Sequence, residues 1–207
     1  MYIGIAVVIS MLYSGVAMQK NNFSPMVMVP GIVKGKPFEA DVESLILHKL
    51  DAGQTKQSVM KGKIYRDSSG RRRQDMRFEV LPDQWADITS IIDPSTQTYY
   101  IIDNTNKTVV RQTMNATQEE NNPGESESDT QENGLSRKIE GISCYEHRLN
   151  LGTSDVEFCF SPELREVLFE KRISNLEEKV IRLFNIHRIE PEVTLFAIPP
   201  NYKIISR

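Results

Sequence analysis

The stretch YRDSSGRRRQDMRFE, residues 65–79, decides the fold because it holds a turn whose geometry follows from its residue types. Asp67 stands at the first position and Gly70 at the fourth position of a four-residue turn. This is the preference of a type I turn that ends in a left-handed glycine. Strand-like sequence flanks the turn on both sides, so we predict an antiparallel hairpin. The predicted opposed pairs are Asp67–Arg71, Tyr65–Arg73, Ile64–Gln74, Lys63–Asp75 and Gly62–Met76.

The predicted register sorts the hairpin residues by polarity, because side chains alternate between the two faces of a strand. On the polar face we expect an ion pair between Lys63 and Asp75 and a cation–π contact between Tyr65 and Arg73. The polar face would carry Lys61, Lys63, Tyr65, Arg71, Arg73, Asp75, Arg77 and Glu79. The other face would carry Met60, Ile64, Met76, Phe78 and Val80, with Arg66, Arg72 and Gln74 near the turn.

The arginines in and beside this turn have several interpretations. Nucleic-acid binding is disfavoured because the chain has a formal net charge of −3. A phosphate-cradling loop requires glycine-rich spacing that leads into a helix, whereas a strand follows here. Two interpretations remain: a solvated sheet face whose charges are compensated by acids, and a contact site for an anion or an acidic partner. The second would use Arg66, Arg71, Arg72 and Arg73.

The two-residue period continues along most of the chain. FEADVESLILHKLD, residues 38–51, alternates with Phe38, Val42 and Ile46 on one face. The best helix signal is one turn at residues 191–196, which begins with proline and precedes two further prolines. We therefore predict a mainly β fold: a single strongly curved antiparallel sheet or half-barrel with few short helices. Other strands are expected at 57–66, 72–80, 88–92, 99–102, 108–111, 139–149, 156–160, 165–173, 179–189 and 202–205.

The N-terminal sequence is typical of an exported protein. An uncharged apolar run covers residues 2–18, which is shorter than the roughly 20 residues of a bilayer span. Small residues precede a cleavage point after Ala17, so residues 1–17 are interpreted as a signal peptide or, alternatively, an uncleaved anchor. Residues 18–36 are interpreted as a linker punctuated by proline and glycine, and residues 37–207 as one β domain.

Residues 112–134 differ in composition from the rest of the domain. This segment has no Lys or Arg and carries Glu119, Glu120, Glu125, Glu127, Asp129 and Glu132. Few apolar groups and charge of one sign cannot offset the entropy lost on ordering. We predict a disordered acidic surface loop, with a functional acidic tether as the alternative.

The chain has two cysteines, Cys144 and Cys159, a number that fits one disulfide in an exported protein. A symmetric hairpin centred on the turn-like residues 151–155 would place them opposite each other, close enough to bridge. Two free, buried thiols are the alternative interpretation.

The sequence offers no recognisable catalytic or metal-binding motif. His48, His147 and His187 fall in separate predicted strands, without the spacing of a metal site. No Gly-x-Ser-x-Gly motif is present. We predict a protein that is not an enzyme and that uses no metal and no cofactor. A hydrolase is the less favoured alternative, and it would require one of these histidines beside a carboxylate and a nucleophile.

Several motifs occur together in one order along the chain. They are GKPFEADVES (35–44), KIYRDSSGRRRQD (63–75), IIDPSTQTYYIID (91–103), KIEGISC (138–144) and LFAIPPNYKI (195–204). This ordered set resembles a family of uncharacterised secreted bacterial proteins. The Phe-x-Ile-Pro ending after consecutive strands is also distantly similar to the lipoprotein-carrier (LolA-like) superfamily. That resemblance implies a half-barrel whose concave apolar face holds acyl chains or, in a regulatory branch, senses mislocalised lipoproteins.

Together these features predict a non-catalytic exported protein of the cell envelope, periplasmic or extracellular and at most close to a membrane. It would bind a hydrophobic, lipid-like ligand or an envelope protein partner through its curved sheet, and no nucleic acid. A structural or regulatory interaction module without a small ligand is the alternative. The expected ligand-binding residues are Phe38, Val42, Ile46, Ile64, Met76 and Phe78.

Overall fold

A computed structural model describes residues 32–50, 53–114 and 135–206. All described residues belong to one compact unit, residues 31–207. The predicted signal peptide or anchor therefore lies outside the described residues, as do most of the predicted linker and of the acidic loop.

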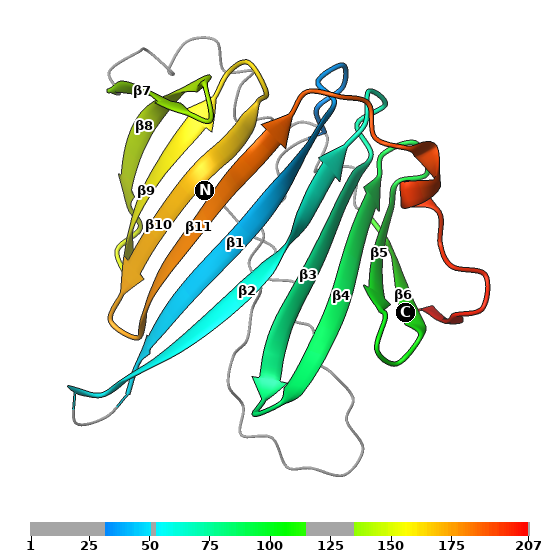
Figure 1. Cartoon of the computed structure of the whole chain (residues 1–207), viewed down its shortest axis with the longest axis horizontal. Coiled ribbons are helices and arrows are strands. Elements are labelled where there is room, and N and C mark those ends of the chain that lie inside the picture. The colour runs from blue at the N-terminus through cyan, green and yellow to red at the C-terminus, as the bar shows by residue number, and fades with distance from the viewer. Residues whose placement is uncertain (1–31, 51–52, 115–134, 207) are drawn as a thin grey trace. The chain divides into compact units, whose positions relative to one another are not determined.

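The described residues form strands and one 3₁₀ turn, and no α-helix occurs among them. All twelve strands belong to one sheet (Figure 1). The predicted mainly β fold with a single sheet is therefore confirmed. The strands are β1 (Phe38–Lys49), β2 (Thr55–Arg66), β3 (Arg72–Leu81), β4 (Gln84–Asp93), β5 (Thr98–Asp103), β6 (Thr108–Thr113), β7 (Ser136–Ile139), β8 (Ile142–Asn150), β9 (Ser154–Ser161), β10 (Glu166–Ser174), β11 (Glu177–His187) and β12 (Lys203–Ser206), and the 3₁₀ turn η3 is Val193–Phe196.

The sheet consists of two meanders joined in its middle. Its strand order is β12-β6-β5-β4-β3-β2-β1-β11-β10-β9-β8-β7. Strands β1 to β6 follow one another on one side, strands β11 to β7 do so on the other, and the long-range pair β1–β11 joins the two halves (Figure 1). Neighbouring strands are antiparallel except β12, which adds to β6 in parallel at one edge.

The predicted hairpin between β2 and β3 is confirmed, including its register. The backbone N–H of Asp67 donates to the carbonyl oxygen of Arg71 at 3.1 Å, and Gly70 has a φ of 90°. The prediction of an ion pair between Lys63 and Asp75 is wrong. Lys63 Nζ instead lies 3.5 Å from Asp41, because β1 pairs with β2 on its other side.

Several predicted boundaries are wrong; β4, for example, begins at Gln84 instead of at residue 88. Residues 139–149 do not form one strand, because a turn at Glu140 and Gly141 separates β7 from β8. Both turn residues have positive φ, 51° and 79°, as in the tight turns that join antiparallel strands. Strand β6 continues through Gln112 and Thr113, two residues that we expected in the acidic loop.

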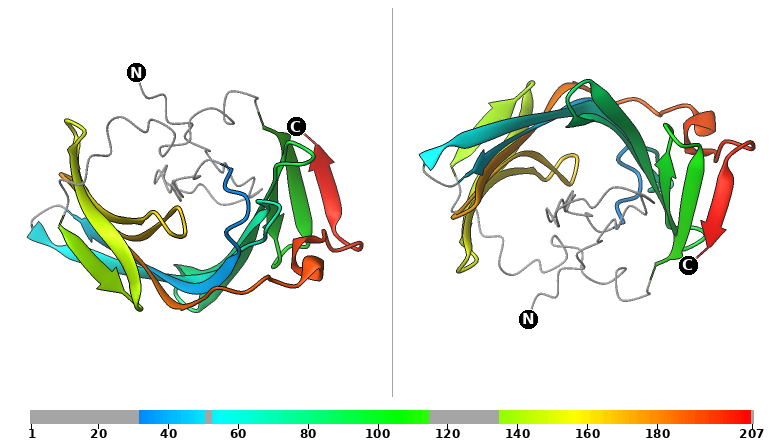
Figure 2. Two further views of the ribbon diagram at one scale, coloured as in Figure 1. Left: turned by 90° about the horizontal axis from the view of Figure 1, so that it is seen from above. Right: turned by 90° about the horizontal axis from the view of Figure 1, so that it is seen from below.

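The sheet is bent, so it has a concave and a convex face (Figure 2). Gly62 in β2 permits close approach of β3, because a Cβ atom at this position would lie 1.7 Å from the carbonyl oxygen of Asp75. A glycine inside a strand often marks such an approach or a bend. The pairing is also irregular between β1 and β11, between β3 and β4 and between β9 and β10, and such bulges typically bend a strand.

Buried hydrophobic side chains form two clusters. The first is built around β1, β2 and β8–β11 and contains Phe38, Ala40, Val42, Ile64, Ile142, Cys144, Cys159, Leu164, Leu168 and Leu183. The second lies on β4–β6 beneath the C-terminal segment and contains Ile91, Ile102, Val109 and Phe196. The first cluster thus spans the junction of the two meanders, whereas the strand residues of the second cluster belong to the β1–β6 meander alone.

Candidate functional site

The register of β1, β2 and β3 places the six predicted ligand-binding residues on one face. Val42 in β1 lies opposite Gly62, which lies opposite Met76 in β3. Residues two positions apart in a strand share a face. Phe38, Val42, Ile46 and Ile64 are buried, and Met76 and Phe78 are half-buried. This face, called the inner face below, carries Phe38, Ala40, Val42, Ser44 and Ile46 from β1, Met60, Ile64 and Arg66 from β2, and Arg72, Gln74, Met76 and Phe78 from β3.

The inner face lies on the concave side of the sheet. The turn between β9 and β10 at residues 162–165 bends toward that side, and the segment at residues 32–37 runs along it (Figure 2). Arg66 on the inner face contacts both segments. Its Nη2 donates to the carbonyl oxygen of Leu164, and its Nε donates to that of Lys36 at 2.9 Å. These two segments therefore cover the inner face next to the hairpin turn.

Arg66 and Arg72 share one buried carboxylate. Arg66 Nη1 lies 3.3 Å from Glu166 Oε2, and Arg72 contacts both oxygens of Glu166, with Nη2 3.3 Å from Oε1. The side chains of Arg66, Arg72 and Glu166 are 2%, 9% and 6% exposed. Burial lowers the pKa of Arg66 to about 10, while the Glu166 charge opposes this shift and the Arg72 and Arg165 charges add to it. Two buried cations and one buried anion leave one positive charge uncompensated.

Three buried polar atoms of the inner face have no hydrogen-bond partner among the described residues. They are Ser44 Oγ, Arg72 Nε and Gln74 Oε1. Buried polar groups are normally paired, because an unpaired one costs about 1–3 kcal/mol. Arg72 and Gln74 are two residues apart in β3 and share the face. A polar group of a ligand on this face would satisfy such atoms.

A second set of buried charges lies farther along the concave side. Lys179 in β11 lies opposite Ile46 of the inner face and opposite Arg172 in β10. Glu170 Oε1 lies 3.6 Å from Arg172 Nε. Burial lowers the pKa of Lys179, and the Glu170 charge opposes this shift. Cations therefore lie near both ends of β1 on the concave side.

The four arginines predicted as one anion contact do not form one surface. Arg71 and Arg73 alternate with Arg72 and point to the convex side, where the C-terminal segment runs. Arg71 Nε lies 2.6 Å from Asp67 Oδ2, and its guanidinium stacks 4.6 Å from the ring centre of Phe196. Arg73 pairs with Asp75 at 2.9 Å and donates to the carbonyl oxygen of Leu195 rather than stacking on Tyr65. Both convex arginines thus hold the hairpin and the C-terminal segment together.

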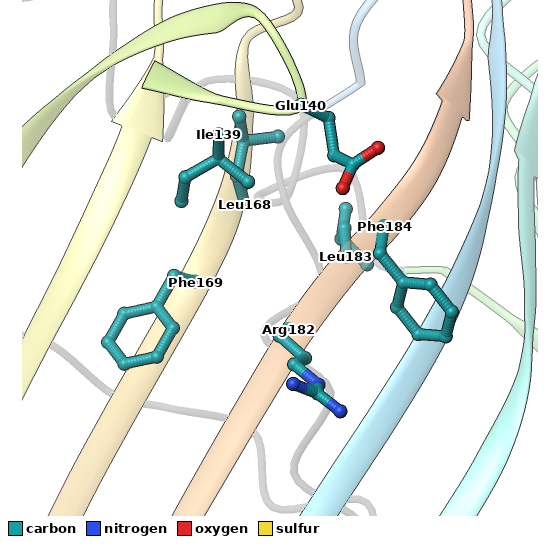
Figure 3. Close-up of a pocket in the computed structure, with 7 residues that line it drawn as sticks. All are labelled: Ile139, Glu140, Leu168, Phe169, Arg182, Leu183 and Phe184. Atoms are coloured by element: carbon teal, nitrogen blue, oxygen red, sulfur yellow. The ribbon is translucent and has the colours of Figure 1, made fainter. Parts of the chain in front are cut away.

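A cavity of about 440 Å³ lies between the β7–β8 turn and strands β10 and β11 (Figure 3). Ile139 and Glu140 approach it from the turn, and Phe169, Arg182 and Phe184 reach it from the two strands. Arg182 Nη2 already pairs with Glu43 at 2.6 Å. The cavity is thus lined mainly by apolar side chains, and its one cation among the described residues, Arg182, is already paired with Glu43. Its lining residues are Ile139, Glu140, Leu168, Phe169, Arg182, Leu183 and Phe184.

The predicted disulfide between Cys144 and Cys159 is confirmed, with the two Cα atoms 5.4 Å apart. The predicted register around it is wrong. Cys159 lies opposite Glu146, and Asn150 lies opposite Asp155. The residue opposite Cys159 thus lies two positions beyond Cys144 in β8, so the cysteines are diagonal neighbours on one face.

The three histidines remain in separate strands. His48 Nδ1 lies 3.8 Å from Glu177 Oε2, His147 stacks on Phe158 with ring centres 5.0 Å apart, and His187 lies opposite Glu39. Within residues 32–50, 53–114 and 135–206, no group of three or more His, Cys, Asp or Glu side chains could hold a metal ion. In the same part of the chain, no helix has the length and apolar character needed to cross a bilayer.

Sequence reasoning missed Glu166 and Glu170 as site residues. Both alternate with Leu168 in β10, so two carboxylates stand at buried positions of one strand. The available signal was the two acidic residues on the same strand face as Leu168, at positions where the two-residue period expects burial. Their cationic partners are far away in the sequence, and the signal does not identify them.

No family model matches the sequence, and no curated protein matches it. Solved structures show low similarity. PNGF-II, crystallised in space group P21, is 12% identical with a TM-score of 0.46 over 83% of this chain, which spans only 32% of the length of PNGF-II. A beta-barrel-like protein of a domain of unknown function, DUF1849, from Brucella abortus is 9% identical with a TM-score of 0.46, over 76% of this chain and 100% of that one.

A LolA superfamily protein from Nitrosomonas europaea is 8% identical with a TM-score of 0.36, over 78% of this chain and 90% of that one. All three TM-scores lie below 0.5, so the similarities carry no argument about function. The secreted family that the motifs suggest stays a prediction.

Proposed function

We propose that this protein is a non-catalytic, exported binding protein that holds a hydrophobic, lipid-like ligand on its inner face. The observation that carries the proposal is the gathering of Phe38, Val42, Ile46, Ile64, Met76 and Phe78 on the concave side of the sheet. An apolar sheet face must be covered, because exposed apolar area is unfavourable in water. A concave apolar face is also the usual setting of a small-ligand site.

The two ends of the inner face differ in how they are covered. Next to the hairpin turn, Phe38 is fully buried beneath the guanidinium of Arg66, 4.7 Å from its ring centre. Farther along β3, Met76 and Phe78 are only half-buried. The half-buried part is where we place the entry of the apolar ligand.

Two further observations support the proposal, one on the exported compartment and one on the non-catalytic role. The Cys144–Cys159 disulfide is typical of oxidising compartments outside the cytosol. The charged groups next to the inner face already serve as ion pairs, Arg66 and Arg72 with Glu166. We therefore assign these groups to structure and recognition rather than to proton transfer.

The proposal is tested with the full chain purified from its host. Native mass spectrometry would detect copurified lipid, and titration with the apolar fluorophore N-phenyl-1-naphthylamine would measure binding to the purified protein. Met76→Asp places a charge in the site and should weaken probe affinity at least about 10-fold, because burying an unpaired charge is unfavourable. Arg77→Asp introduces the same residue on the convex face and should leave the affinity unchanged.

The overturning results are distinct. Absence of both copurified lipid and probe binding would refute the ligand, and so would equal effects of the two variants when circular dichroism shows both to be folded. Copurification of a protein partner in place of lipid would favour the interaction module instead.

A further inference from the structure

We infer that the ligand of the inner face carries an anionic head group, a carboxylate or a phosphate ester, and that Arg72 binds this group. The inference rests on the proposed function and adds the chemistry of the ligand's polar end. It starts from the buried charges beside the hairpin turn.

The first argument is the balance of charge. Arg66 and Arg72 are both buried and share Glu166 as their carboxylate. Arg165, in the turn that covers them, adds a third positive charge to the electrostatic environment of Arg66. A buried excess of positive charge is strongly unfavourable unless an anion pairs with it. An anionic ligand group would supply that pairing.

The second argument is an unused hydrogen-bond donor. Arg72 is 8% exposed, and its Nε has no partner among the described residues. Gln74, also 8% exposed, leaves its Oε1 unpaired two positions farther along the same face. Because the oxygen and nitrogen of an amide are nearly isosteric, rotation of the Gln74 amide would present its NH₂ group to an anion. Arg72 and Gln74 together thus offer donors to one acceptor group.

The third argument is the position of these donors relative to the apolar residues. Along β3, Arg72 and Gln74 are followed on the same face by Met76 and Phe78. The six residue-to-residue steps from Arg72 to Phe78 span about 20 Å at the rise of a strand, which suits a long acyl chain. The polar group and the apolar body of an amphiphile would therefore each meet matching side chains.

The experiment measures displacement of N-phenyl-1-naphthylamine from the full chain at about pH 8. The competitors share one chain and differ in head group: oleate, 1-oleoyl-lysophosphatidylglycerol and the neutral oleyl alcohol. At least one anionic competitor should bind about 10-fold more tightly than oleyl alcohol, because hydrogen bonds to charged groups are the strong ones. Whichever anionic lipid is preferred identifies the carboxylate or the phosphate ester as the natural group, and acetate and inorganic phosphate test whether the head group alone suffices.

Variants then assign the effect to Arg72. Arg72→Gln removes the excess charge and keeps the Arg66–Glu166 pair, so the preference for anionic competitors should fall to within about 2-fold while oleyl alcohol binds as before. Arg77→Gln, on the exposed side of the same strand, should keep the preference. Equal binding of oleate, the lysolipid and oleyl alcohol by the unmodified protein would overturn the inference and leave the proposed function intact. Failure of the probe itself to bind would instead overturn the proposed function.

Discussion

Two pairs of arginines, interleaved in one short stretch of sequence, lie in opposite environments. Arg66 and Arg72 on the concave side are almost fully buried and share Glu166. Arg71 and Arg73 on the convex side are about one quarter exposed, at 26% and 21% of their side chains, and pair with Asp67 and Asp75.

The difference shows that position along a strand, rather than residue type, decides what an arginine does. Arg71 and Arg72 are adjacent, yet their side chains leave the sheet on opposite faces. The convex pair finds its carboxylates within four residues, whereas the concave pair depends on a carboxylate more than 90 residues away. The buried pair should therefore be the more sensitive to loss of its partner.

The largest effect is expected for Glu166→Gln, which leaves Arg66 and Arg72 buried without a counter-charge. Removal of one partner from a buried ion pair destabilises a protein by about 3–5 kcal/mol. Urea unfolding followed by circular dichroism at pH 7 would measure the loss. Glu163→Gln is the control, because its pair with Arg188 is about half exposed, at 44% and 53%, and should contribute at most about 1 kcal/mol. Equal losses in the two variants would mean that the concave pair is solvated like a surface pair.

A smaller effect is expected for Arg71→Gln on the convex side. The change removes the ion pair with Asp67 and the stacking on Phe196. Asp67 still accepts hydrogen bonds from the Ser69 hydroxyl and the backbone N–H of residue 71, so the carboxylate is not left unpaired. We expect a loss of about 2 kcal/mol, measured by urea unfolding, with faster amide exchange near Phe196. A loss of stability as large as that of Glu166→Gln would contradict the expectation that the buried arginines are the more sensitive to loss of their partner.

The smallest effect concerns Glu43, an acidic residue of the convex face. Partial burial raises its pKa, but hydrogen bonds from Lys61 and Arg182 and their charges outweigh this and lower the pKa below 4.5. Because the folded-state pKa is the lower one, the stabilisation is present above 4.5 and is lost as the pH falls through the folded-state value. Glu43→Gln should therefore reduce stability by about 0.5 kcal/mol at pH 7 and match the unmodified protein at about pH 2.5. Unfolding curves of both proteins at both pH values test this. A difference in stability that persists at about pH 2.5 would show that the ionised carboxylate of Glu43 is not its cause.

Much of the fold could be predicted from local sequence. The Asp67–Gly70 turn fixed the register of β2 and β3, because turn geometry leaves few alternatives for the flanking residues. The same reasoning failed at Glu140 and Gly141, where a non-glycine residue adopts positive φ and ends a strand that the polarity pattern continues. The disulfide was predicted although its register was wrong, since an offset of two residues in the strand pairing keeps both cysteines on one face.

The candidate site could be predicted in its apolar part and in the placement of Arg66, Arg72 and Gln74 on the same face, but not in the pairing of its charges. Phe38, Ile64 and Met76 followed from the two-residue period, which is a property of each strand alone. The pairing of Arg66 and Arg72 with Glu166 could not be predicted, because it depends on which strands of the second meander reach the concave side. For the same reason the predicted ion pair between Lys63 and Asp75 is not formed, and Lys63 pairs with Asp41 instead.

The sequence by itself determined the alternation of polar and apolar residues, the hairpin turn at Asp67–Gly70 and most of the strand content, because these arise from interactions between residues close in the chain. Only the tertiary structure decided that β1 pairs with β11, that β3 approaches β2 closely at Gly62, and that two arginines are buried with one glutamate. These features depend on contacts between distant segments, whose free energy depends on burial and on the location of the opposite charge. A one-dimensional pattern contains neither quantity.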